Sequence, residues 1–226
     1  MITTPDDIMT FLRGAALTTA TTLGHADNSD LGPTEGSGFY RAWPEDLAAI
    51  QELGVTDVRI TLDWARLQPK PGMLDDDWSE WFEHLLAAAD AIGLRAWATL
   101  LDASTPRWFD NDGGFADDAN FERWWPRWVG AAADRFGDHV GGWIPFVALP
   151  SAAWQQPWAD TWTALRGDAP VVRSVDPTLI EPASLSADQQ NATGLVTRIG
   201  DGPEHLGQLL RDAAEAADGP VIVSSL

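Results

Sequence analysis

The chain has 226 residues, 45% of them hydrophobic, which predicts a single domain, residues 1–226, with a substantial core. Its formal net charge of −20 argues against binding to nucleic acid or anionic membranes, because both carry charge of the same sign. The absence of cysteine excludes disulfides and thiol chemistry. We see no signal peptide or membrane-spanning run, and we expect a cytoplasmic protein with an acidic, solvated surface.

Tryptophan is abundant, with 13 residues in this length. Indole rings stack on sugar rings, so the number suits a carbohydrate-binding protein, but indoles also fill hydrophobic cores. Because several of the tryptophans recur at helical spacing, we expect core packing to be the commoner role.

The first part of the chain predicts a strand, a loop and a helix. Residues 11–24 predict a short buried strand followed by a polar turn, and residues 25–38 a polar loop. A helix opens near Pro44, which suits a first turn, and Gly54 ends it. Three residues form its predicted apolar stripe: Leu47, Ile50 and Leu53.

Two strand–loop units follow, joined by a helix. Val58–Leu62 and Ala96–Leu101 predict buried strands, each followed by polar and aromatic residues. Between them Asp77–Gly93 predicts a helix, and the spacing of Asp77 and Glu80 predicts a capping box at its start. Polar residues just past the C-terminal ends of parallel strands stand where such folds usually carry their chemistry.

One face of the 77–93 helix is apolar and aromatic. Its members recur at helical spacing, so we expect them to pack on the sheet rather than to form a binding platform: Trp78, Trp81, Phe82, Leu85, Leu86 and Ala89.

The remaining elements continue the alternation. A helix is predicted over Asn120–Phe136, with Pro126 kinking its first turns or delaying its start. A fourth strand is predicted around Trp143 and a fifth within 170–184. Residues 194–199 predict either a short sixth strand or the approach to a last helix. That helix would run from about residue 201 to 219, and Pro220–Leu226 predicts a final buried strand.

Several of these segments resemble glycoside hydrolase family 1, the β-glucosidase type. Val58–Pro69, Val-Arg-Ile-Thr-Leu-Asp-Trp-Ala-Arg-Leu-Gln-Pro, resembles the family's second strand, and Trp143–Pro150 resembles its fourth. The resemblance is strongest from Phe39 to Phe146. It implies an α/β fold: a shortened or incomplete (β/α)8 TIM-type barrel of parallel strands with outer helices. Residues 151–200 would be a shortened variable region of it.

The resemblance also shows where this chain departs from the family. The family's catalytic acid falls on Ala148 and its nucleophile on Ser225, whereas retaining glycosidases need two carboxyl groups about 5–5.5 Å apart. A one-residue shift does not restore the acid, because residues 140–159 contain no carboxylate. We therefore expect no catalytic residue at the family's positions.

Positions that contact the sugar in the family have changed as well. Its Gln falls on Thr21, which cannot make the paired contact of an amide to two hydroxyls, and its His falls on Asp102. Arg59 remains, and we expect it to pair with Asp102 or Asp63 in a buried ion pair. Six residues are candidate ligand contacts: Thr21, Arg59, Asp63, Trp64, Asp102 and Trp108.

We expect neither a metal nor a cofactor. The four histidines are scattered without ligand spacing, and the chain has no Gly-rich phosphate loop and no Gly-x-Ser-x-Gly motif. Three carboxylates nevertheless follow the ends of predicted strands: Asp63, Asp102 and Glu181. They could form a new acid–base pair or bind a divalent cation, and the sequence leaves both alternatives open.

Three functions remain open from the sequence. The first is a pseudoenzyme that binds a protein or a small ligand. The second is a hydrolase of O-glycosyl bonds that uses Asp102 with Asp63 or Glu181. The third is a non-catalytic sugar-binding module that relies on Trp64 and Trp108. A barrel of five to seven strands has an open edge. We also expect this edge to be covered by residues 151–200, by a second copy in a homodimer, or by another protein partner.

Overall fold

The computed structural model describes residues 14–17, 37–102 and 105–146, three single residues (Leu165, Ala169 and Val171), and the backbone of three later strands. The predicted helix over residues 201–219 lies outside these described residues.

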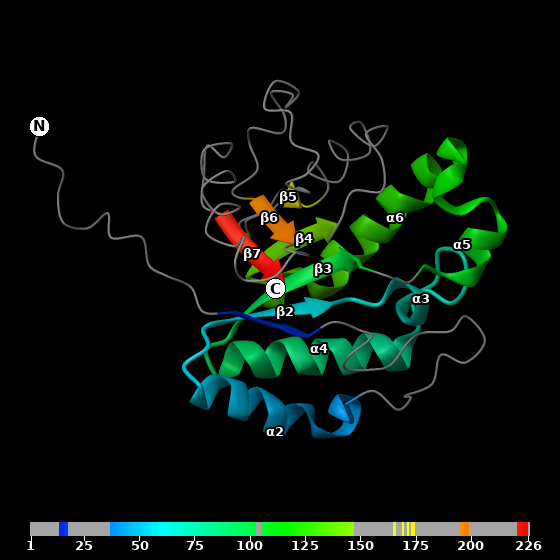
Figure 1. Ribbon diagram of the computed structural model, residues 1–226. Helices are drawn as coiled ribbons and strands as arrows, with labels where there is room; N and C mark the ends of the chain where they lie inside the picture. Colours follow the sequence, from blue (N-terminus) through cyan, green and yellow to red (C-terminus); the bar gives the residue numbers. More distant parts are fainter. Residues whose placement is uncertain are drawn as a thin grey trace, which may run out of the picture.

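Seven parallel strands in the described chain follow one another in sequence order (Figure 1). One sheet contains β1 (Gly14–Leu17), β2 (Asp57–Thr61), β3 (Arg95–Leu101) and β4 (Gly142–Phe146). The other contains β5 (Arg173–Ser174), β6 (Leu195–Arg198) and β7 (Val221–Ser225). A parallel bridge between Trp143 and Val171 links them. This is the strand order of a (β/α)8 barrel, with one strand fewer in the described residues than the closed form.

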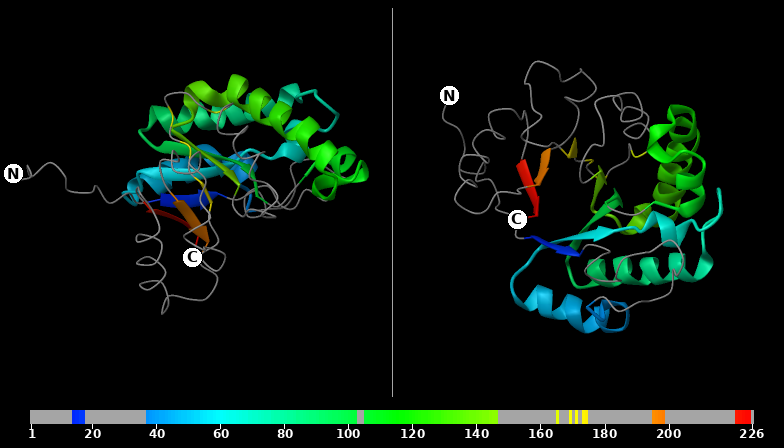
Figure 2. Two further views of the ribbon diagram at one scale, coloured as in Figure 1. Left: turned by 90° about the horizontal axis from the view of Figure 1, so that it is seen from above. Right: turned by 45° about the vertical axis from the view of Figure 1, so that its right-hand side comes forward.

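Three long helices lie along the outer side of the first sheet (Figures 1 and 2): α2 (Phe39–Glu52), α4 (Asp76–Ala91) and α6 (Asp118–Phe136). Two short helices follow strand ends, α3 (Trp64–Leu67) after β2 and α5 (Arg107–Asn111) after β3. Single 3-10 turns, η1 (Gly114–Ala116) and η2 (Gly137–His139), flank α6.

The core lies between these helices and the strands. Alternate residues of β2 and β3, such as Val58, Ile60 and Ala98, are buried in one cluster with side chains of α4 and α6. Trp128 of α6 donates its indole N–H to the carbonyl oxygen of Leu100 at 3.2 Å. The other face of each strand is therefore left to line the inside of the barrel.

The predicted apolar face of α4 packs as expected. Four of its six residues are buried in the core: Phe82, Leu85, Leu86 and Ala89. Trp78 and Trp81 are partly buried and pack on the ring of Tyr40 from α2, with centroids 5.5 and 5.4 Å from it. These two tryptophans thus join α4 to α2.

Several predicted details are wrong. The N-cap of α4 is Asp75, whose carboxylate accepts from the Trp78 N–H at 3.0 Å, so the expected Asp77–Glu80 capping box does not form. Of the two effects expected of Pro126, the delayed start is absent, because α6 starts at Asp118 under the cap of Asp117 and includes Pro126. Because the buried aromatic face of α6 is extensive, it offsets the hydrogen bond that a proline removes.

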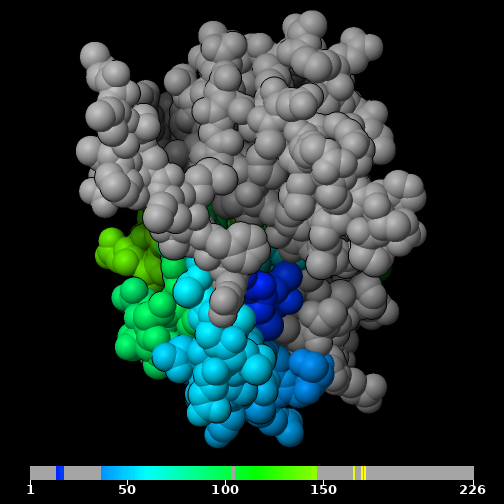
Figure 3. Space-filling model, turned by 60° about the vertical axis from the view of Figure 1, so that its left-hand side comes forward, coloured from blue at the N-terminus to red at the C-terminus, as the bar shows by residue number. Residues whose placement is uncertain are grey.

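Two burial predictions also fail. Leu53 caps α2 and is 78% exposed, because the chain turns away there at Gly54, whose φ is 75°. β1 is only half-buried, since it pairs with β2 on one edge while its outer side reaches the surface beside α2 (Figure 3). By contrast, β6 confirms the sixth strand over its alternative.

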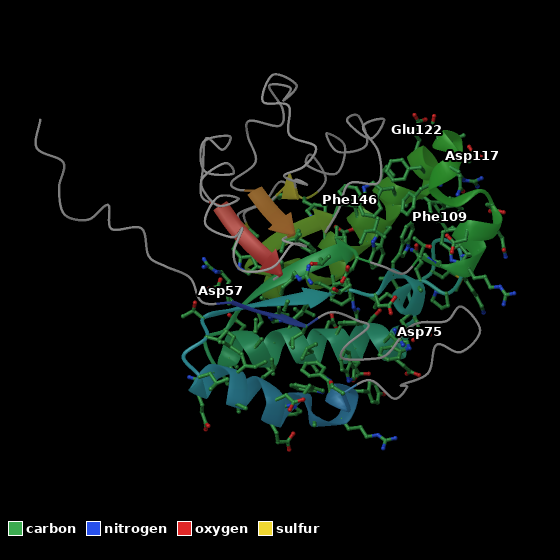
Figure 4. All side chains as sticks on the ribbon, in the orientation of Figure 1. Asp57, Asp75, Phe109, Asp117, Glu122 and Phe146 are labelled. Carbon is green, nitrogen blue, oxygen red and sulfur yellow. The ribbon has the colours of Figure 1, made fainter. Side chains whose placement is uncertain are left out.

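Asp57 anchors the N-terminal ends of β2 and β3, where Figure 4 labels it. Its carboxylate accepts from Arg95 Nε at 2.5 Å, Thr56 Oγ1 at 2.6 Å and Trp97 Nε1 at 2.8 Å. Burial alone would raise the pKa of this carboxyl, but these hydrogen bonds and the Arg95 charge outweigh it and hold the pKa below its ordinary value of 3.8. The cluster favours the ionised form.

Asp57→Asn is expected to lower the free energy of unfolding at neutral pH by about 1–2 kcal/mol, since Arg95 is half-exposed and its charge is screened. A carboxyl whose pKa is lowered on folding stabilises the protein at any pH above its pKa in the unfolded chain. That stabilisation is lost as the pH falls through the pKa in the folded protein. Urea unfolding from about pH 5 to about pH 2 should therefore show a steeper loss of stability in the wild type than in the variant. Equal slopes would contradict this role.

Candidate functional site

The inner face of β2 and β3 carries a group of polar side chains. Val58 and Ile60 point into the core, so Arg59 and Thr61 take the opposite face, on which Thr61 is in register with Thr99 of β3. Exposure is 6% for Arg59, 6% for Thr61 and 0% for Thr99.

Asp102 completes this group just past the end of β3. It is partly buried, and the hydroxyl of Thr61 donates to its Oδ2 at 3.4 Å. We call Arg59, Thr61, Thr99 and Asp102 the inner polar cluster. It combines a guanidinium, two hydroxyls and a carboxylate at the C-terminal half of two adjacent strands, where parallel barrels bind ligands.

Arg59 and Asp102 are among the candidate ligand contacts predicted from the sequence, whereas Thr61 and Thr99 are not. The signal that could have found Thr61 was the strand period of two: with Arg59 facing inward, Thr61 must do so as well. Thr99 could not be placed in this way, because counting from Gly54 and Gly93 would set Thr61 beside Leu100, one residue away from the observed register.

Thr99 is the unusual member of the cluster. Its hydroxyl oxygen is buried and has no hydrogen-bond partner among the described residues. Replacing it with the isosteric Val should therefore leave the free energy of unfolding unchanged or raise it by up to about 1–2 kcal/mol, because a buried unsatisfied hydroxyl is removed. Thermal or urea unfolding of Thr99→Val checks this; a loss of more than about 1 kcal/mol would show that the hydroxyl has a stabilising partner.

Asp63 occupies a structural position instead. It is the N-cap of α3, accepting from the backbone N–H groups of Ala65 at 3.0 Å and Arg66 at 3.4 Å, and it is ion-paired with the Arg66 guanidinium. Both side chains are fully buried. From the sequence, Asp63 is expected to contact a ligand or Arg59, and its ion pair with Arg66 is not predicted.

Trp64 lies in the core and does not form an open platform. It is 1% exposed, stacks on Trp128 at a centroid distance of 5.8 Å, and donates its indole N–H to Gln68 Oε1 at 2.9 Å. Trp108 lies at the edge of the same aromatic group, partly exposed, and donates to the Gln68 carbonyl oxygen at 2.8 Å. Of the two expected sugar contacts, only Trp108 has ring surface at the exterior.

The other named positions are not part of this described geometry. Thr21, Ala148 and Glu181 lie outside the described residues, and Ser225 is the last residue of β7, of which only the backbone is described. Within the described ranges, no three His, Asp or Glu side chains come together as a metal site. No helix in these ranges is both long and apolar enough to span a membrane.

Comparison with known sequences points to one family. A family model described as glycosyl hydrolase family 1 matches residues 20–159. A β-glucosidase of Agrobacterium sp. is 28% identical over 124 residues, 54% of this chain and 25% of that one. The human cytosolic β-glucosidase is 28% identical over 109 residues, 47% of this chain and 23% of that one. The chain thus spans about a quarter of the length of the curated relatives it matches.

Solved structures agree on the fold. The family 1 β-glucosidase from Thermotoga maritima superposes with a TM-score of 0.72 at 14% identity, covering 95% of this chain and 77% of that one. The β-glycosidase BGL167 gives a TM-score of 0.69 at 19% identity, covering 94% and 76%. The family model spans more than half of the chain, including β2, β3 and β4, and the chain therefore belongs to glycosyl hydrolase family 1.

Proposed function

We propose that this protein is a β-glucosidase-like pseudoenzyme: a family 1 scaffold that binds a ligand at the inner polar cluster without hydrolysing it. The proposal depends mainly on one observation: neither of the two positions that carry the family's catalytic carboxyl groups holds an acidic residue in this chain. By the register of the family's fourth and seventh strands, the acid position holds Ala148 and the nucleophile position holds Ser225. Neither side chain can take the part of a carboxyl group in glycosidic bond cleavage.

The described geometry supports the proposal on a second point. A hydrolase rebuilt on Asp102 needs another carboxylate as its acid or base. Asp63 is a poor candidate, because Arg66 and two backbone N–H groups of α3 already bind its carboxylate in the core. No hydrogen bond of Asp102 to a second carboxylate is found in the described part of the chain.

The inner polar cluster suits a small ligand rich in hydroxyl groups. The Asp102 carboxylate accepts hydrogen bonds, whereas the Arg59 guanidinium donates them, and each threonine hydroxyl does both. A sugar offers matching donors and acceptors on neighbouring carbons. A binding module built on Trp64 and Trp108 together is disfavoured, because the ring of Trp64 is buried in the core.

Ligand binding is tested by titrating β-glucosides and oligosaccharides while following tryptophan fluorescence. Asp102→Asn keeps the shape of the side chain and removes its charge, so it should weaken binding by about tenfold or more. Asp134→Asn, an exposed carboxylate on α6, is the matched control and should bind as the wild type does. A response that stays flat up to millimolar sugar, or equal affinities for both variants, would contradict ligand binding at this cluster.

A further inference from the structure

One outer face of the described part of the chain carries three exposed cations that take part in none of its ion pairs. Lys70 lies in the turn after α3, and Arg123 and Arg127 lie one turn apart on α6. In the described part of the chain the ion pairs are Asp63–Arg66, Asp57–Arg95 and Glu83–Arg135, and none involves these three residues.

The ring of Trp124 stacks with two of these cations. The guanidinium carbon atoms of Arg123 and Arg127 lie 4.9 and 5.2 Å from its ring centroid. The ring also meets the edge of Trp108 at 4.8 Å, and a Cβ on Gly72 would lie 3.7 Å from it. Little of the Trp124 ring is left to stack on a sugar, but the outer N–H groups of a guanidinium stacked in this way can still pair with carboxylates. Lys70, Arg123, Arg127 and Trp124 are called the basic patch below.

An acidic patch lies on the neighbouring helix. Asp76, Asp77 and Glu80 are exposed on the first turns of α4, and they too are absent from the ion pairs of the described residues. The Arg135–Glu83 ion pair at 2.8 Å shows that α4 and α6 lie side by side. Figure 4 labels Asp75, Asp117 and Glu122 at the same end of the molecule, where both helices begin.

Between the two patches the chain forms a tight turn with an apolar tip. Lys70 and Met73 pair across it, Gly72 has a φ of 71°, and Met73 is 63% exposed. An exposed methionine between opposite charges can serve as an adaptable apolar contact at the centre of an interface. On α6, the acidic residues Asp118 and Glu122 lie about 100–180° round the helix from Arg123 and Arg127.

We propose that this face binds a second copy of the chain in a two-fold dimer. In such a contact each copy places its basic patch on the partner's acidic patch, with the two Met73 side chains near the axis. Adjacent patches of opposite charge are self-complementary under a two-fold rotation, which is the commonest symmetry of protein dimers. The net charge of −20 on each copy opposes association, so the contact is of micromolar strength.

The test is the mass of the full chain in solution, measured by sedimentation velocity from about 1 to about 300 μM. The wild type should dimerise within this range. Arg123→Glu with Arg127→Glu, and separately Asp77→Arg with Glu80→Arg, should each raise the dimer Kd by at least about tenfold. An equimolar mixture of the two double variants should dimerise again, because the reversed patches complement each other.

Two exposed residues away from this face serve as controls. Arg41→Glu on α2 and Asp90→Arg near the end of α4 reverse single charges and should leave the dimer Kd unchanged. Melting temperatures of all variants show whether each is folded, and recovery in the mixture excludes misfolding as the cause of dissociation. A monomeric wild type at every concentration would overturn the proposal. So would a dimer that survives both reversals, or a mixture that stays monomeric.

Discussion

Asp63→Ala is expected to lower the free energy of unfolding by about 3–5 kcal/mol, a large fraction of the stability of an ordinary domain. The substitution removes the carboxylate that forms an ion pair with Arg66, whose charged side chain is fully buried. It also removes the cap of α3, where the Asp63 carboxylate accepts from the N–H of Ala65 at 3.0 Å. Equilibrium unfolding in urea measures the change.

A double variant distinguishes the cost of leaving one charge of the ion pair behind from the cost of removing both charges. Asp63→Leu combined with Arg66→Met removes both charges, so it should be clearly more stable than Asp63→Ala, as expected when a buried pair is replaced by apolar side chains. Asp63→Asn should lie between the wild type and Asp63→Ala, because it can still cap α3. A loss below about 1 kcal/mol for Asp63→Ala would show that the carboxylate is free for another purpose, such as ligand binding.

Trp64→Ala is the second large effect, with an expected loss of about 3–5 kcal/mol. Trp64 stacks on Trp128, and its ring centroid lies 4.8 Å from that of Phe109 and 5.8 Å from that of Trp125. Removing the indole leaves a cavity among rings of two other helices, α5 and α6, which cannot both move to fill it. Unfolding monitored by circular dichroism measures the loss.

Trp108→Ala is the matched comparison, because this tryptophan is only partly buried and should cost less than Trp64→Ala. If Trp64 served mainly as a sugar contact, the order would reverse: Trp64→Ala would leave stability nearly intact and abolish sugar binding. Measuring both properties on both variants distinguishes core packing from ligand contact.

The strands were predictable because each is a short apolar run bounded by turn residues. β2 and β3 were placed within one residue of their observed bounds, and β6 was identified as one of two alternatives. Helix starts were less predictable, since a run of aspartates offers several caps of equal quality. Asp75, Asp76 and Asp77 are equivalent locally, and the contact of the following helix with the sheet decides among them.

The site was only half predictable for a related reason. Arg59 and Asp102 stood out as charged residues within or just past apolar strands. The segment after β2 was expected to be a loop, but it forms the short helix α3, which brings Asp63 and Arg66 into an i,i+3 pair. The burial of Trp64 depends on residues of α5 and α6, which lie roughly 40 to 60 residues further along the chain. A local sequence pattern does not predict such distant contacts.

The central claim is that a family 1 scaffold is present without the chemistry of cleavage. The most direct test is hydrolysis of activated aryl β-glycosides by the purified protein across a range of pH, with Asp102→Asn measured alongside. Activated leaving groups need little help from an acid, so they give a weakened site its best opportunity. The proposal predicts no turnover above the buffer rate and no difference between wild type and variant. Turnover that Asp102→Asn abolishes would show a rebuilt active site and contradict the assignment of Ala148 and Ser225 as positions of lost function.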